Sequence, residues 1–156
     1  MKKILIAYGA LVLIVVALAV AKFNGFNFLP NIASSTAEIR GHKYNLMIAK
    51  DDKSRQVGLS NRKSLDENSA MLFIFEKKGK YSFWMKDTQI PLDIIYINDG
   101  KIVHIVKNAA PQKGNNGSLP IYTPPTDANY VLEINGGQSD KYKFASGDTI
   151  TLKGIK

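Results

Sequence analysis

The hydrophobic pattern divides the chain into an apolar N-terminal segment and a longer stretch in which apolar and polar residues alternate. Ile4 to Ala21 are eighteen residues without a charge, preceded by Lys2 and Lys3 and followed by Lys22. At about 1.5 Å per residue, a helix of this length covers roughly 27 Å, close to the hydrocarbon thickness of a bilayer. The pattern therefore predicts a membrane helix whose leading lysines stay in the cytoplasm.

Two interpretations of residues 1–22 stay open. An uncleaved signal anchor is favoured, because the apolar run is longer than the roughly 7–15 residues of a signal-peptide core. The alternative is a cleaved signal peptide, since Ala19-Val20-Ala21 has the small residues of a cleavage site. Either way, we expect the remaining chain outside the cytoplasm. It would be held by a single pass through the cell membrane, with residues 4–21 in the bilayer, or secreted after cleavage following Ala21.

A change of composition marks the start of the folded domain. Residues 23–35 are rich in Gly, Pro, Asn and Ser and are predicted to be a linker. The exported domain is then expected at residues 36–156, and no internal repeat is visible in it.

From Thr36 onward the dominant period is two, which is typical of half-buried strands. Strands are predicted at residues 38–40, 44–48, 70–75, 81–86, 92–97, 101–106, 130–134 and 149–153. Asn98-Asp99-Gly100 predicts a hairpin turn between two of them. Short helices are expected at 53–59, with Asp51 and Asp52 at its start and Val57 and Leu59 pointing inward, and near 139–144.

Residues 107–128 are polar and rich in Pro and Gly, and the stretch is too long for an ordinary connection. Many short strands with one or two small helices predict an α+β domain. Its sheet is expected to be mostly antiparallel and curled or barrel-like.

Composition and charge exclude several classes of protein. The chain has no cysteine, so a disulfide framework, a thiolate zinc site and a cysteine nucleophile are excluded. Residues 31–156 keep 18 of the 21 basic and all 13 acidic residues, a modest charge of +5 with no basic stripe that would predict nucleic-acid binding. His42 and His104 are the only histidines, so no metal site is expected. No nucleotide-binding or hydrolase motif predicts a cofactor or a reaction.

Candidate binding chemistry lies on the predicted strand through Tyr81–Thr88. Its alternation places Tyr81, Phe83 and Met85 on a core face. The opposite face carries Ser82 with the indole of Trp84, the ammonium of Lys86 and the hydroxyl of Thr88. These groups can stack on a sugar or hold a carboxylate or phosphate. The alternative is that Trp84 packs under the 107–128 stretch, while Lys86 pairs with Asp87 or Asp93.

Two carboxylates are predicted to lie inside the sheet. Asp93 shares a strand face with Ile95 and Ile97, and Glu133 alternates with Val131. A buried carboxylate needs a partner, and for Asp93 the candidates are Lys86, Arg62 and Arg55. Such a pair is either structural or part of an acid/base site, with Asp93 and Glu133 as weak candidates for catalysis.

Arg55 and Arg62 are seven residues apart and would share one helical face if the helix continued through Gly58. In that arrangement they could bind an anion. We therefore include both among the candidate ligand-binding residues.

Several motifs resemble those of the family called domain of unknown function 192 (uncharacterised protein family 0127), over roughly residues 37–153. They are Arg55-x-x-Gly58-Leu59-x-x-Arg62-x-x-Leu65, Met71-Leu72-Phe73-x-Phe75, Ser82-Phe83-Trp84-Met85-Lys86-x-Thr88, Ile90-Pro91-Leu92-Asp93, Val131-Leu132-Glu133-Ile134 and Gly147-Asp148. Two residues depart from the family's pattern: Ala70 stands where glycine is usual, and Asp87 where asparagine is usual. The resemblance implies a small, mostly β domain that is often exported and has no established activity.

The sequence predicts a membrane-anchored envelope protein of the bacterial type that binds a small carbohydrate or anion, rather than an enzyme. The expected site comprises Trp84, Lys86, Thr88 and Asp93 under the 107–128 stretch, with Arg62 and Arg55 as further candidates. Two alternatives remain: a hydrolase of envelope carbohydrate using Asp93 and Glu133, and a structural domain that binds another protein.

Overall fold

The structure is a computed structural model that describes residues 35–111 and 120–155. The predicted membrane helix, nearly all of the predicted linker and the middle of the 107–128 stretch lie outside the described residues. Within the described ranges, no helix is long and apolar enough to cross a membrane.

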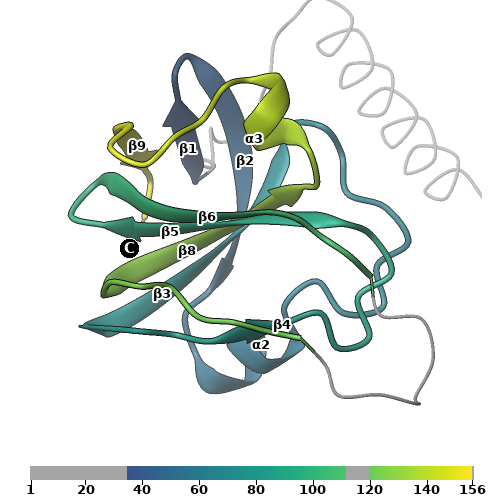
Figure 1. Cartoon of the computed structure of the whole chain (residues 1–156). Helices are drawn as coiled ribbons and strands as arrows, with labels where there is room; N and C mark the ends of the chain where they lie inside the picture. Colours follow the sequence, from purple (N-terminus) through teal and green to yellow (C-terminus); the bar gives the residue numbers. More distant parts are fainter. Residues whose placement is uncertain (1–34, 112–119, 156) are drawn as a thin grey trace, which may run out of the picture. The chain divides into compact units, whose positions relative to one another are not determined.

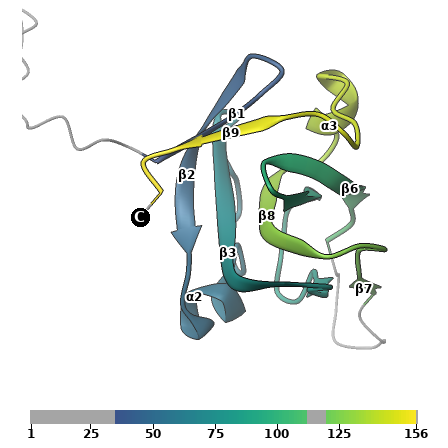
Figure 2. The same ribbon diagram turned by 90° about the vertical axis from the view of Figure 1, so that its left-hand side faces the viewer.

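Seven strands form one sheet in the order β6-β5-β8-β3-β2-β1-β9 (Figures 1 and 2). Their bounds are β1 (Thr36–Ile39), β2 (His42–Ala49), β3 (Ser69–Gly79), β5 (Leu92–Asn98), β6 (Lys101–Ala109), β8 (Ala128–Asn135) and β9 (Ile150–Lys153). Neighbouring strands are antiparallel except for β2 and β3, which are parallel because a helix and a loop connect them. The prediction of a mostly antiparallel sheet is confirmed.

The sheet curls so that the first residues of its two edge strands, β6 and β9, come into contact. Lys101 at the start of β6 forms a bridge with Thr149, just before β9. The backbone N–H of Ile102 donates to the carbonyl of Asp148, and that of Ile150 donates to the carbonyl of Gly100, each at 2.9 Å. From this contact β9 continues as the antiparallel neighbour of β1 at the other edge of the sheet (Figure 2). The described chain is therefore a mostly β, half-barrel form of an α+β fold.

Two short helices lie at opposite ends of the sheet (Figure 1). They are α2 (Asp52–Val57) and α3 (Gln138–Lys141). β4 (Phe83–Trp84) and β7 (Ile121–Tyr122) form a separate, two-stranded antiparallel ribbon. β7 falls inside the predicted 107–128 connection, where only two apolar residues mark it.

Each face of the sheet carries a hydrophobic core. Along β5, Ile95 and Ile97 belong to a core that also contains residues of β1, β9 and the segment after α3. Leu92, Ile94 and Tyr96 belong to a second core, beneath α2 and the β4–β7 ribbon. Neighbouring residues of a central strand therefore serve different cores.

Helix α2 has the predicted acidic N-terminus but ends at Val57, two residues before the predicted end at Leu59. Asp51 is the N-cap: its side chain accepts a hydrogen bond of 2.9 Å from the backbone N–H of Ser54, and the Ser54 hydroxyl accepts one from Asp51 N–H at 3.2 Å. Gly58, at φ +49°, ends the helix. Leu59 is buried as predicted, whereas Val57 is 54% exposed, which corrects its expected inward position.

The predicted strand at residues 81–86 is also corrected. Only Phe83 and Trp84 form β4, because the chain turns at once: the backbone N–H of Thr88 donates to the Met85 carbonyl at 3.1 Å. Asp87 in this turn has a left-handed φ of +56°. Side chains beyond Trp84 are therefore positioned by a turn and do not follow strand alternation.

Candidate functional site

A cavity of about 250 Å³ opens between α2, β3 and the β4 segment. Five of its lining side chains are aromatic, and four of them pack in pairs. Phe73 meets Phe83 edge to face with ring centroids 4.9 Å apart, and Phe75 stacks on Tyr81 at 3.6 Å. The complete lining is Arg55, Gln56, Val57, Gly58, Leu59, Ser60, Phe73, Phe75, Tyr81, Ser82, Phe83, Trp84, Lys86, Thr88 and Glu133. Such aromatic walls fit a ligand with an apolar face.

Glu133 supplies the only carboxyl group among these lining residues. It lies on β8 between Met71 of β3 and Ile94 of β5, and it is only 5% exposed. Burial among apolar neighbours raises the pKa of Glu133 to about 8. At neutral pH the group is therefore mostly protonated, and it can donate a hydrogen bond into the cavity as well as accept one.

Tyr96 lies on the same face of the sheet as Glu133, and its pKa is also shifted by burial. Burial raises the pKa of its hydroxyl, and the nearby carboxylate charge of Glu133 raises it further. The Tyr96 hydroxyl donates a hydrogen bond of 2.8 Å to the carbonyl of Tyr122 in β7. The neutral phenol thus anchors the ribbon over the second core.

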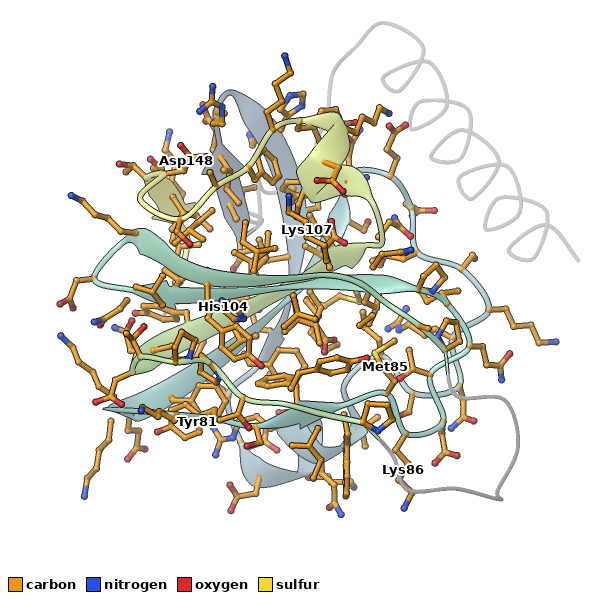
Figure 3. All side chains as sticks on the ribbon, viewed as in Figure 1. Tyr81, Met85, Lys86, His104, Lys107 and Asp148 are labelled. Atoms are coloured by element: carbon orange, nitrogen blue, oxygen red, sulfur yellow. The ribbon has the colours of Figure 1, made fainter. Side chains whose placement is uncertain are left out.

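Trp84 forms an open wall of the cavity, since its side chain is 53% exposed. The ammonium of Lys86 lies 5.8 Å from the centroid of the indole ring. Figure 3 shows Lys86 pointing outward, whereas Met85, the residue before it, points into the interior. Among the ion pairs of the described residues, none joins Lys86 to Asp87 or Asp93. An aromatic face and a cation thus stand side by side at the mouth.

The turn after β4 is held against the segment that follows α2. The Ser60 hydroxyl donates to the carbonyl of Lys86 at 3.2 Å, and the backbone N–H of Asn61 donates to the carbonyl of Asp87 at 2.8 Å. Thr88 lines the cavity but is 5% exposed, and its hydroxyl donates to the Lys86 carbonyl at 3.3 Å. The structure thus brings Trp84, Lys86 and Thr88 to one cavity, as predicted, although a turn places them there.

Arg55 lines the cavity, but its guanidinium is already engaged. It donates to the carbonyls of Lys50 at 2.6 Å and Ile74 at 2.9 Å, and it pairs with Asp52 at 2.6 Å. Arg62 is exposed and does not line the cavity. Because α2 ends at Val57, the two arginines share no helical face, which corrects the expected pairing.

Asp93 lies elsewhere, on the opposite face of the sheet. It is fully buried, and its carboxylate accepts three backbone hydrogen bonds, from Asn108 at 2.7 Å, Gly137 at 2.9 Å and Ser139 at 2.6 Å. Its partners are thus N–H groups, where Lys86, Arg62 or Arg55 was expected. Asp93 has the structural role that sequence left open, and its expected place beside Trp84 is corrected.

The two carboxylates do not flank a common space. Asp93 pairs across the sheet with Ile134, while Glu133 pairs with Ile94. Cross-strand partners share a face and successive residues alternate, so Asp93 and Glu133 point to opposite faces. A pair of acids acting on one glycosidic bond must face one substrate. This geometry argues against the predicted hydrolase pair.

Comparison with known proteins gives the chain a family. The family model for domain of unknown function 192, described as "Uncharacterized ACR", matches residues 35–152. The chain belongs to the domain of unknown function 192 family. No curated protein matches this member of the family.

Two solved structures resemble this member of the domain of unknown function 192 family. A protein of unknown function from Novosphingobium aromaticivorans is 28% identical with a TM-score of 0.68, covering 76% of this chain and 83% of the other. A putative transcription regulator from Sinorhizobium meliloti is 29% identical with a TM-score of 0.71, covering 79% of this chain and 96% of the other. These matches support the fold.

The two departures from the usual pattern of domain of unknown function 192 are accommodated locally. Ala70 is fully buried inside β3 opposite Leu46, where a methyl group fits and no turn is required. Asp87 adopts the left-handed conformation, which asparagine and aspartate tolerate better than most residues.

Sequence reasoning missed that Glu133 joins Trp84 and Lys86 in this domain of unknown function 192 member. It also missed Ser60 and the aromatic wall of Phe73, Phe75 and Phe83. One signal was present: a lone acid within Val131-Leu132-Glu133-Ile134 is unusual in a buried strand. The strand order that places it beneath α2 and β4 is not readable from that signal.

Proposed function

We propose that this member of the family is a binding module tethered to the outer side of the cell membrane, and that its cavity holds one unit of a small carbohydrate. The observation that carries this proposal is that the exposed indole of Trp84 and the buried carboxyl of Glu133 line the same cavity. The C–H faces of a sugar ring can pack on an aromatic surface. The hydroxyl groups of the sugar need polar partners that both donate and accept hydrogen bonds.

The size and lining of the cavity support a small polar ligand. A volume of about 250 Å³ lies just below the roughly 300–1,000 Å³ of pockets for drug-sized molecules. Glu133, Ser60 and Thr88 offer a few polar groups among aromatic walls, the usual composition of a ligand site. Binding is favoured over hydrolysis because the second carboxylate that a glycosidase needs is absent from this lining.

Replacing Trp84 with alanine is expected to weaken binding of a monosaccharide at least tenfold, because stacking on the exposed ring is lost. Trp84 is the only tryptophan, so the measurement is titration calorimetry, which does not depend on its fluorescence. The matched control is Ile121→Ala. Ile121 pairs across the ribbon with Trp84 and is 66% exposed, but it does not line the cavity. Equal affinity in Trp84→Ala and the wild-type protein would contradict the proposal.

A second function is favoured by one observation. Among the described residues, three large apolar side chains are exposed, Val57, Trp84 and Ile121, and a protein partner could cover them. The two functions differ at Ile121, which a sugar in the cavity does not need. If Ile121→Ala abolished capture of a protein partner while sugar binding was undetectable, the interaction function would replace the sugar-binding one.

The membrane location has its own test. We expect the full chain to remain in the membrane fraction after an alkaline wash and to be digested by protease added to bacterial spheroplasts. Leu13→Arg combined with Val16→Arg should release the chain into the soluble fraction, because each charge in a membrane helix costs roughly 2.5–3.5 kcal/mol. Protection of the wild-type chain from external protease would contradict the export prediction. A soluble form beginning at Lys22 would identify cleavage after Ala21.

A further inference from the structure

The cavity carries an asymmetric distribution of charge. Arg55 is neutralised by Asp52, with which it forms an ion pair of 2.6 Å. Lys86 is exposed, and no ion pair of the described residues includes it. Its ammonium lies beside the exposed indole of Trp84, 5.8 Å from the ring centroid. The uncompensated charge at the mouth is therefore positive and adjoins the surface on which a ring would stack.

We propose that the cavity prefers an acidic sugar, whose ring stacks on Trp84, whose carboxylate pairs with Lys86, and whose hydroxyls meet the carboxyl of Glu133. This inference rests on the proposed function and specifies its ligand class. A carboxylate is the group that satisfies an uncompensated ammonium at the mouth, and the charge-assisted hydrogen bond between them is stronger than a neutral one. A neutral sugar would leave Lys86 without this partner.

Glu133 adds a proton requirement to this arrangement. A mostly neutral carboxyl does not repel an anionic ligand bound in the same cavity, whereas an ionised carboxylate would repel it. Tyr96 of β5 is the titratable group that interacts with Glu133, and Arg55 of α2 and Tyr81 and Lys86 on either side of β4 line the same cavity. Arg55 is compensated by Asp52, and Lys86 is at the mouth. The proton on Glu133 therefore decides whether the floor of the cavity is neutral or negative.

The first experiment compares sugars that differ only in their acidic group. Titration calorimetry of residues 1–156 in detergent at pH 6.5 uses two pairs: glucose with glucuronate, and N-acetylglucosamine with N-acetylmuramate. We expect the acidic member of a pair to bind about fivefold more tightly, the effect of about 1 kcal/mol from one exposed ion pair. Lys86→Gln should remove this preference. Lys43→Gln, which changes the same charge at an exposed position on β2, should keep it.

The second experiment varies pH from 6 to 9 and tests the role of Glu133. Affinity of the wild-type protein for the acidic sugar should fall about tenfold as pH rises through 8, while Glu133→Gln should stay nearly constant. Circular dichroism of the same samples separates lost binding from unfolding. The control is Glu38→Gln, which removes a carboxylate at an exposed position of β1. Equal binding of neutral and acidic sugars, or a preference that survives Lys86→Gln, would overturn this inference and leave the proposed function standing. Absence of binding by all four sugars would overturn both.

Discussion

Replacing Asp93 with alanine should lower the free energy of unfolding by about 3–5 kcal/mol. The carboxylate accepts hydrogen bonds from the backbone N–H groups of Asn108, Gly137 and Ser139, at 2.7, 2.9 and 2.6 Å. Each buried donor left without a partner costs about 1–3 kcal/mol. Asp93 is fully buried, so water cannot replace the lost acceptor without opening the packing around it. Urea denaturation followed by circular dichroism gives the change.

A matched control separates the effect of losing a buried acid from the effect of losing an exposed acid on the free energy of unfolding. Asp140→Ala removes an acid from α3, where its ion pair with Lys107 is exposed, and should cost at most about 1 kcal/mol. Asp93→Asn keeps the shape but loses one acceptor oxygen, so its destabilisation should lie between those of the other two variants. If Asp93→Ala cost no more than Asp140→Ala, the three hydrogen bonds would not be stabilising the fold.

The glycine segment that contacts Asp93 shows why the hydrogen-bond partners of this carboxylate were hard to predict from the sequence. Asn135-Gly136-Gly137 is typical of a strand breaker, yet it places the backbone N–H of Gly137, and that of Ser139 just after it, on the carboxylate. A Cβ at Gly136 would lie 2.7 Å from Asn108 Oδ1 and 2.9 Å from Pro91 Cβ, and Gly137 has a φ of +85°. The requirement for glycine comes from chain segments distant in sequence. Local pattern could therefore place Asp93 inside the sheet but could not name its partners.

The alternating pattern predicted the faces of Asp93 and Glu133, and the hairpin predicted at Asn98-Asp99-Gly100 is confirmed, since β5 pairs with β6 there. The pattern did not predict the other strand pairings. It placed Asp93 with Ile95 and Ile97, and Glu133 with Val131, and these assignments are confirmed by the two cores. A period of two contains no information about which strands are neighbours or in which register. For this reason the sequence left Asp93 and Glu133 as a candidate pair, although register puts them on opposite faces.

Three residues of the candidate site were predicted correctly, but the structure gives a different reason for their proximity. Trp84, Lys86 and Thr88 were grouped because alternate residues of a strand share a face. β4 ends at Trp84, and the turn through Asp87, bound to the segment after α2, brings the other two to the cavity. Tertiary contacts replaced strand geometry at this point, and only the contacts could reveal Ser60 and the aromatic wall.

Glu133 should make the folded domain less stable as pH rises, and Glu133→Gln should remove this dependence. The pKa of Glu133 is about 8 in the folded chain, against an ordinary value of 4.5. Below pH 4.5 the group is protonated in both states and carries no penalty. Between pH 4.5 and 8 the unfolded chain releases the proton while the folded chain keeps it, so stability falls by up to about 1.4 kcal/mol per pH unit.

The measurement is the free energy of unfolding in urea at several pH values from 4 to 9. Glu133→Gln should match the wild-type protein near pH 4 and exceed it by several kcal/mol above pH 8, because glutamine keeps the shape without ionising. Glu38→Gln, on an exposed position of β1, should retain the wild-type slope. A parallel dependence in Glu133→Gln and the wild-type protein would mean that Glu133 ionises freely, and the cavity floor would then be negative at neutral pH. A domain with this dependence tolerates the buried acid at neutral pH because it keeps the proton, and that same proton leaves the floor neutral for a ligand.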